Sequence, residues 1–230
     1  MFEPLKITAK MQTQICFNDF LRLDNILSAA KAKEILQSDY YLNPKQAGDL
    51  QLIIDTLSQF LKYNEKLKVF HSSCATDGKE FVTAYSKRWN GFRDGAVKYK
   101  GKGKQEIDTL RGFFKAYRNP LVYHTIPEVV FYANGDKTEI ERLLKNNIAY
   151  LGKKSSQGYG KVKEWAVEVI GDDKSIFNDG KLMRFVGIEE YINAGYQTDD
   201  SLFTIETATI PPAYRKETEI CFMPNFGVHI

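Results

Sequence analysis

The sequence predicts an α+β fold in which a core of the order strand, helix, strand, strand, helix, strand carries a helical insertion and a β-rich C-terminal extension. Three observations support this prediction. Residues 5–17 alternate apolar and polar side chains, as in a half-buried strand. Apolar residues between positions 140 and 151 recur at helical spacing. Residues 161–170 alternate again and predict a last strand.

The first strand is expected to lead into a helix and then into an inserted helix. Asp24 can cap a helix that runs to about Leu36, because its carboxylate can accept amide hydrogens of the first turn. A further helix is expected after Pro44, where apolar residues return every three or four positions. These residues are Leu50, Ile53, Ile54, Leu57 and Leu61.

The middle of the chain is rich in aromatic and β-branched residues, which favour strands. Pro120 and Pro127 restrict the strands that contain or flank them to edges or bends. Residues 89–105 are polar, contain glycines and show neither strand nor helix periodicity, so a loop or mobile hairpin is expected there. The expected strands are 67–73, 81–86, 109–124 and 128–133.

The second core helix has the clearest local signals. Asn134-Gly135 predicts a turn, Asp136 and Glu139 have the spacing of a capping box, and Gly152 is expected to end the helix. A βαββαβ order with helices on one face of the sheet predicts a ferredoxin-like, RRM-like core over residues 1–171. Residues 172–230 are expected to pack on this core as an extension, with strands at 182–186, 203–210 and 219–222.

Composition excludes several classes of protein. The chain has 230 residues and a net charge of +3, and it shows neither a leader-like N-terminus nor an apolar run that could span a bilayer, so no membrane role and a cytoplasmic location are expected. Cys16, Cys74 and Cys221 lie far apart and are expected to be thiols of the core. Histidines and cysteines lack metal-ligand spacing, and the Asp172-Asp173 and Asp199-Asp200 pairs resemble loop acids, so no cofactor is expected.

Charge is strongly segregated along the chain. Residues 87–118 contain ten basic and three acidic residues, and residues 145–164 contain five lysines and one glutamate. Residues 168–206 contain nine acidic and three basic residues. One lysine-rich stretch alone is often a solvated loop, but two such stretches in an otherwise acidic chain favour a polyanionic ligand.

The segment between the second helix and the last strand combines four properties of a backbone-binding loop. Its glycines allow positive φ and close approach of another chain, its lysines add charge, its small polar residues donate hydrogen bonds, and its tyrosine can stack on a base. The loop comprises Gly152, Lys153, Lys154, Ser155, Ser156, Gln157, Gly158, Tyr159, Gly160 and Lys161.

Two other kinds of loop share parts of this sequence. A helix C-cap followed by a tight turn explains Gly152 but not Gly158 and Gly160. A nucleotide phosphate loop requires a glycine-lysine-serine sequence between a strand and a following helix, and here the order is reversed.

The pattern Gly152-x5-Gly-Tyr-Gly-Lys-Val162 after the last helix of such a core resembles the signature of the RAMP superfamily of CRISPR-associated proteins. Three further segments look like the Cas-five-type subunit of type IV CRISPR effector complexes. They are Glu3-Pro-Leu-Lys-Ile-Thr-Ala9, Leu23-Asp-Asn-Ile-Leu27 and Pro211-Pro-Ala-Tyr214.

The resemblance implies a non-catalytic subunit of a ribonucleoprotein that caps the 5′ handle of the crRNA. It implies contacts with a backbone RAMP subunit and a large subunit, and an indirect relation to target DNA through the complex. Residues 153–161 would then hold handle phosphates. Within the basic loop at about 87–108, the segment Lys98–Lys104 would lie where such subunits often carry a thumb-like hairpin. Further RNA-binding candidates are Arg88, Arg93, Lys98, Lys100, Lys102, Lys104, Arg111 and Arg118.

Two alternatives stay open. Relatives in the superfamily include metal-independent endoribonucleases that mature crRNA, in which a histidine moves protons. Of the three histidines, His71, His124 and His229, His124 beside Tyr123 is the candidate, although a structural histidine in a strand is the simpler interpretation. The second alternative is a protein-interaction module whose basic surface meets an acidic partner without RNA.

Overall fold

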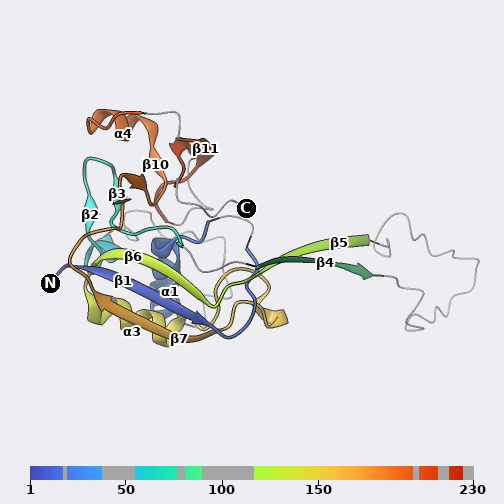
Figure 1. Cartoon of the computed structure of the whole chain (residues 1–230). Coiled ribbons are helices and arrows are strands. Elements are labelled where there is room, and N and C mark those ends of the chain that lie inside the picture. Colours follow the sequence, from blue (N-terminus) through green and yellow to red (C-terminus); the bar gives the residue numbers. More distant parts are fainter. Residues whose placement is uncertain are drawn as a thin grey trace, which may run out of the picture.

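A three-stranded antiparallel sheet forms the centre of the fold, with β1 (Glu3–Met11) between β6 (Glu128–Gly135) and β7 (Val162–Val169) (Figure 1). The computed structural model describes residues 1–17, 20–37, 55–76, 81–89, 117–198, 202–211 and 218–224. Over these ranges the chain is a mixed α/β protein with several small antiparallel sheets.

The alternation predicted for the first strand is confirmed over its first half. Leu5, Ile7 and Ala9 are fully buried, and Ile7 pairs with Phe131 of β6 and Val167 of β7. The strand is shorter than expected, because its register shifts between Lys10 and Met11 and β1 ends there. Residues 12–17 follow a separate path, and this path places the candidate site.

Residues 61–76 continue the sheet beyond β6 through single bridges. Leu61 pairs with Gly135, Ser72 with Ala133, and Thr76 with Val130. Within this segment β2 (Tyr63–Asn64) and β3 (Val69–Phe70) form a small hairpin. The strand expected at 67–73 is therefore two-residue β3 followed by a bridged stretch along β6.

Two helices, α1 (Leu23–Leu36) and α3 (Lys137–Asn147), lie together on one face of the central sheet (Figure 1). Their apolar residues fill the core with the inward side chains of the strands; these residues include Leu23, Leu27, Ala30, Ile140, Leu143 and Leu144. The prediction that Asp24 caps α1 is wrong. The cap position is Arg22, which makes no side-chain cap hydrogen bond. Asp24 is the second residue of the helix, and its carboxylate pairs with a distant arginine.

The cap predicted for α3 is confirmed, since the Asp136 side chain accepts a hydrogen bond from the Glu139 amide at 3.0 Å. The turn expected at Asn134-Gly135 is wrong, because both residues belong to the end of β6 and the chain passes through Asp136 directly into α3. The prediction that Gly152 ends the helix is wrong. The helix ends at Asn147, and the Trp165 indole donates to the carbonyl of the following residue, Ile148, at 2.9 Å.

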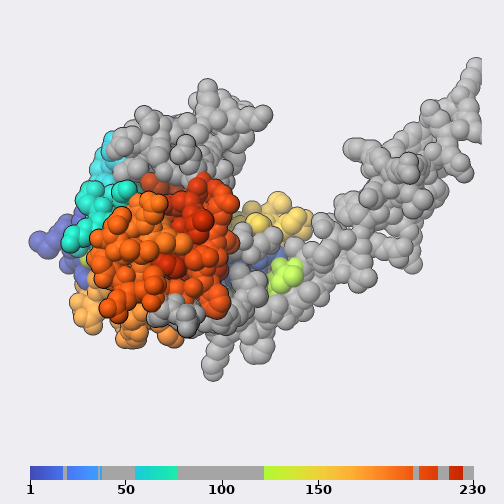
Figure 2. Space-filling model, turned by 90° about the horizontal axis from the view of Figure 1, so that it is seen from above, coloured from blue at the N-terminus to red at the C-terminus, as the bar shows by residue number. Residues whose placement is uncertain are grey.

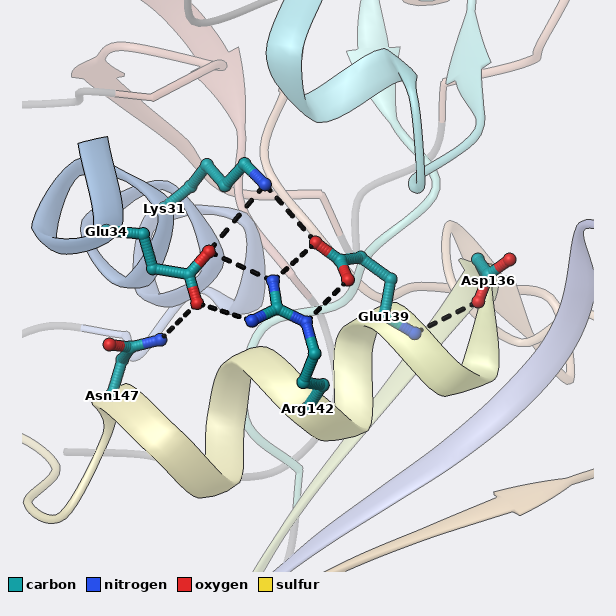
Figure 3. A network of polar contacts seen from close by, with 6 residues as sticks. All are labelled: Lys31, Glu34, Asp136, Glu139, Arg142 and Asn147. Atoms are coloured by element: carbon teal, nitrogen blue, oxygen red, sulfur yellow. Dashed lines mark hydrogen bonds and ion pairs between the residues drawn. The ribbon is translucent and has the colours of Figure 1, made fainter.

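An ion-pair network joins α1 and α3 on the surface (Figure 3). Arg142 donates to both oxygens of Glu34 at 2.7 and 2.9 Å and to Glu139 at 2.8 Å. Lys31 lies 3.2 Å from Glu139, and the Asn147 amide donates to Glu34. The Arg142 hydrogen bonds, against the opposing effect of burial, lower the pKa of Glu139 to about 2. The network links the solvent-facing sides of the two helices.

Two long strands, β4 (Phe81–Trp89) and β5 (Tyr117–Thr125), form a ribbon that extends away from the rest of the chain (Figure 1). Both strands were predicted, with β4 longer than expected. The expected edge position of Pro120 agrees with the pairing of the described strands, in which β5 has β4 as its one strand partner and meets Ile15 only at His124. We call this ribbon the arm.

The C-terminal elements are small and gather on one face beside residues 55–76, as the orange and red atoms in Figure 2 show. Only part of this arrangement was predicted, since the strand expected at 182–186 is two short pieces and α4 was not expected. The elements are β8 (Phe177–Asn178), β9 (Lys181–Leu182), β10 (Val186–Gly187), α4 (Ile188–Asn193), β11 (Thr204–Thr207) and β12 (Glu219–Phe222), with a sheet of order β10-β12-β11.

Several predictions fall outside the described residues. They are the first part of the inserted helix after Pro44, the loop at 89–105 beyond Trp89, the strand residues 109–116 and the Pro212–Tyr214 part of the late motif. Residues 55–58 are helical, and Leu57 and Leu61 are buried as predicted. Among helices in the described ranges, none combines the length and the apolar character that a membrane crossing requires.

Candidate nucleic-acid interface

The loop from residue 152 to 161 has a backbone that glycine makes possible. Gly152, Lys154, Gly158 and Gly160 all have positive φ, between 64° and 87°, and residues Ser155–Gln157 form one 3-10 turn between them. A methyl group on Gly152 would overlap the Cys16 carbonyl oxygen, and one on Gly160 would overlap the Leu151 carbonyl oxygen. Gly158, by contrast, faces open space. Close packing thus requires glycine at both ends of the loop.

The loop is bound along one edge to residues 12–16, which we call the linking segment. The Gly160 amide donates to the Gln14 carbonyl at 2.6 Å, and the Lys153 amide donates to the Cys16 carbonyl at 2.6 Å. The Leu151 amide also donates to the Gly160 carbonyl at 2.8 Å and closes the base of the loop. These bonds hold the loop in one conformation before any ligand binds.

The other edge of the linking segment binds the arm. Ile15 and His124 exchange both backbone hydrogen bonds, at 2.9 and 2.8 Å. The base of the arm and the loop therefore lie on either side of the same short segment. The arm and the loop also meet directly, since the ring centroids of Tyr123 and Tyr159 lie 5.9 Å apart. The tertiary structure thus brings together the base of the arm and the glycine loop, which belong to two separate basic segments of the sequence.

Two glycine amides of the loop already have acceptors within the protein and are not available for phosphate oxygens. The Gly158 amide donates to the Ser155 carbonyl at 2.9 Å, and the Gly160 amide to Gln14. The lysine side chains remain, because Lys153, Lys154 and Lys161 are all exposed. Cationic side chains on a rigid loop, more than its glycine amides, can therefore contact an anionic backbone.

The position of the loop in the chain excludes both a Walker loop and a helix C-cap. It follows α3 and precedes β7, the reverse of a Walker loop, as predicted. Gly152 is no helix cap, since α3 ends five residues earlier at Asn147. The glycine serves the close contact with Cys16 instead.

Of the basic residues predicted on or near the arm, two lie in described strands. Arg88 of β4 and Arg118 of β5 are register partners near the outer end of the ribbon. The remaining candidates, Arg93, Lys98, Lys100, Lys102, Lys104 and Arg111, lie outside the described residues.

The open face of the central sheet is not a cationic surface. Lys10 lies in register between Glu128 and Glu164 and donates to Glu164 at 3.0 Å. The Glu164 hydrogen bond is the main cause of the raised pKa of Lys10. Lys6 is likewise beside Glu168. Charge on this face is therefore mutually compensated, unlike charge on the loop.

The candidate histidine, His124, is a core residue. Its side chain is 1% exposed and stacks on Phe17 with ring centroids 4.2 Å apart. Tyr123 beside it is half-buried and faces Tyr159. The geometry places this imidazole in the link between arm and loop, away from solvent.

A polar cluster that sequence analysis missed forms around His71. Its Nδ1 lies 2.9 Å from Asp173 Oδ2 and 3.2 Å from Ser175 Oγ, and Ser175 donates to Asp173 Oδ1 at 2.5 Å. Because both partners meet the same ring nitrogen, these groups cannot relay a proton from serine through histidine to aspartate. Burial favours the neutral Asp173 carboxyl, but hydrogen bonds from His71, Ser175 and Asn134 outweigh it and hold the pKa well below its usual range.

Asp173 lies in a loop, as expected, and its contacts join the C-terminal extension to residues at the ends of β3 and β6. No local signal could have revealed it, since His71 and Asp173 are far apart in sequence. Within the described ranges, no three His, Cys, Asp or Glu side chains gather closely enough to hold a metal ion.

The sequence matches one family over most of its length. The model of the family described as CRISPR type IV associated protein Csf3 matches residues 3–181, a span that includes the central sheet, both core helices, the arm and the glycine loop. None of the curated proteins compared with the chain matches it.

Proposed function

Because the chain belongs to the Csf3 family of type IV CRISPR-associated proteins, we propose that this effector component binds guide RNA at the loop 152–161. In this proposal the loop holds the 5′ handle of the crRNA, and the protein contacts a backbone RAMP subunit and a large subunit. Its relation to target DNA is indirect, through the assembled complex.

One observation carries the proposal: three exposed lysines project from a loop whose backbone is already fixed. Lys153, Lys154 and Lys161 lie within nine residues, and the linking segment holds the backbone at Lys153 and Gly160. A preformed loop loses little conformational entropy on binding, so more of the electrostatic attraction to phosphates appears as affinity. The half-buried Tyr159 ring offers a stacking surface beside these charges.

The proposal includes a ferredoxin-like core of the RAMP type. In its support, the stretch 72–76 lies along the free edge of β6, so the strand order runs 72–76, β6, β1, β7. With α1 and α3 on one face, this order is compatible with a βαββαβ chain path. Because lysines on the open face of the sheet are paired with glutamates, the loop is the better candidate for the RNA-binding surface.

We further propose that the protein leaves cleavage of RNA to another component. The burial of His124 against Phe17 supports this part of the proposal, since a general acid or base must reach the proton it transfers.

The proposal is tested with purified full-length protein and a fluorescent repeat-derived RNA. Wild type should bind with an affinity that falls as salt rises from about 50 to about 200 mM. The double variant Lys153→Ala, Lys154→Ala should bind about tenfold more weakly at the lower salt. Its plot of log affinity against log salt should be shallower by about 1.4, because two phosphate contacts are lost.

The matched control removes the same charge elsewhere. Lys62, directly before β2, and Lys66, in the β2–β3 turn, are both exposed, and alanine at both positions should leave affinity and salt slope close to wild type. Equal losses in both double variants would mean that only net charge matters and would exclude the loop. A wild-type protein that purifies free of RNA and binds none at low salt would favour the protein-interaction alternative.

A further inference from the structure

In addition to the backbone hydrogen bonds, the side chain of Thr13 in the linking segment binds the loop. The Thr13 hydroxyl donates to the Gly158 carbonyl at 2.8 Å and accepts from the Lys161 amide at 2.9 Å. A hydroxyl has one hydrogen to donate, and here that hydrogen and an acceptor lone pair both serve the loop. Thr13 is partly buried, and it lies beyond the end of β1.

The two bonds span the last part of the loop, where the Gly158 carbonyl and the Lys161 amide have the Thr13 hydroxyl as their partner. Gly158 has open space around its α-carbon and no β-carbon to limit rotation of the adjoining peptides. The Thr13 bond fixes the carbonyl of this glycine, and the second bond fixes the amide of Lys161. Tyr159 lies between these two anchors. The Thr13 hydroxyl therefore fixes the backbone positions from which the Tyr159 ring and the Lys161 side chain project.

We propose that Thr13 is a positioning residue for RNA binding, and this inference rests on the proposed function of the loop. Its hydroxyl presets the segment 158–161 in the conformation that meets the RNA, without touching the RNA itself. Valine has nearly the same shape but can neither donate nor accept, so Thr13→Val releases the Gly158 carbonyl and the Lys161 amide to solvent. Serine retains the hydroxyl and should restore the contact.

The test compares RNA affinity, thermal stability and amide exchange in full-length variants. Thr13→Val should bind the repeat-derived RNA about fivefold more weakly than wild type, as expected for loss of a hydrogen-bonded preorganisation. Thr13→Ser should bind within about twofold of wild type. The Lys161 amide should exchange faster with solvent in the valine variant than in the serine variant.

Gln14→Ala is the matched control, because the Gly160 amide binds the main-chain carbonyl of residue 14, which alanine keeps. A double-mutant cycle separates positioning from general destabilisation. In the Lys153→Ala, Lys154→Ala background, Thr13→Val should cost less affinity than in wild type, because the contacts it positions are already weakened. Fully additive losses, or a serine variant as weak as valine, would overturn the inference.

Failure of the inference differs from failure of the proposed function. If wild type binds RNA and the loop lysine variant binds weakly, but Thr13→Val equals wild type, then the loop binds RNA without help from Thr13. If the loop lysine variant binds as wild type does, the proposed function of the loop fails and the inference with it.

Discussion

Arg184 and Asp24 form an ion pair in the interior, with Arg184 Nη2 3.0 Å from Asp24 Oδ2 and both side chains 3% exposed. Arg184 also donates to the carbonyls of Thr209, at 2.7 Å, and Phe70. One guanidinium therefore joins the first turn of α1, the end of β3 and two parts of the C-terminal extension. Its charge is compensated by Asp24, and its remaining hydrogens are largely used by main-chain oxygens.

Replacing Arg184 by methionine should lower the free energy of unfolding by about 3–5 kcal/mol, because Asp24 then stays buried without a counter-charge. Urea denaturation measures this loss. The double variant Arg184→Met, Asp24→Leu should recover part of it, since no charge remains uncompensated. Lys181→Met, on the exposed side of β9, is the control and should change stability by less than about 0.5 kcal/mol. A loss of that small size for Arg184→Met would contradict the role given to the pair.

The two glycines that flank Tyr159 should respond differently to alanine. Gly158→Ala adds a methyl group to open space and costs about 1–2 kcal/mol, the price of a left-handed backbone. Gly160→Ala adds overlap with the Leu151 carbonyl to the same backbone strain, and should cost about 3 kcal/mol or more. Thermal unfolding of the two variants checks the order. Equal losses would mean that the loop relaxes around residue 160.

Acid should weaken the contact between α1 and α3 through Glu139. Its folded pKa of about 2 lies below its ordinary value of 4.5, chiefly because of the Arg142 hydrogen bonds, so its contribution is present above pH 4.5 and is lost as pH falls toward 2. Between about pH 6 and pH 3, wild type should lose about 1 kcal/mol more stability than Glu139→Gln, a reduced figure because the carboxylate is partly exposed. Glu65→Gln, in the exposed β2–β3 turn, should behave as wild type.

The three cysteines should be inert in the folded protein. All are buried, as predicted from their spacing, and burial raises the pKa of Cys74 and of Cys221 to about 12, so little thiolate exists at neutral pH. A thiol-reactive dye should label none of them in native protein and all three in denaturant. Rapid labelling without denaturant would show that a buried thiol is accessible.

Repeat-derived RNA should stay intact during long incubation with the protein in the absence of divalent metal. Substituting alanine for His124 should then act on stability, with a loss of about 2–3 kcal/mol from the lost stacking on Phe17. Gel analysis of the RNA and urea denaturation of the variant check both parts. Cleavage by wild type that disappears in His124→Ala would instead support the endoribonuclease alternative.

Elements with strong local signals could be predicted from the sequence. The α3 cap at Asp136 and the buried residues of β7, Trp165 and Val167, follow from spacings of two to four residues. Val169 shares that alternation but is half exposed, because burial also depends on what packs against the end of the strand. The short C-terminal strands had no such signal, since a two-residue strand shows no periodicity.

The same limit applies to the candidate site. The glycine loop and its lysines could be found from their composition, whereas Thr13 could not, because its partners lie about 145 residues away along the chain. Asp24 was misassigned as a cap for the same reason: a carboxylate near a helix start is a capping signal unless a distant guanidinium binds it, and Arg184 is 160 residues away.

The sequence by itself determined the segregated charge, the alternation of β1 and β7, the amphipathic α3 and the glycine-lysine loop that follows it. Only the tertiary structure decided that Ile15 pairs with His124 while Cys16 pairs with Lys153, and that the imidazole is buried. Local periodicity and capping involve residues within one helical turn or one strand. Long-range pairing is decided by register and by which backbone atoms can approach closely, and both emerge only when the whole core packs.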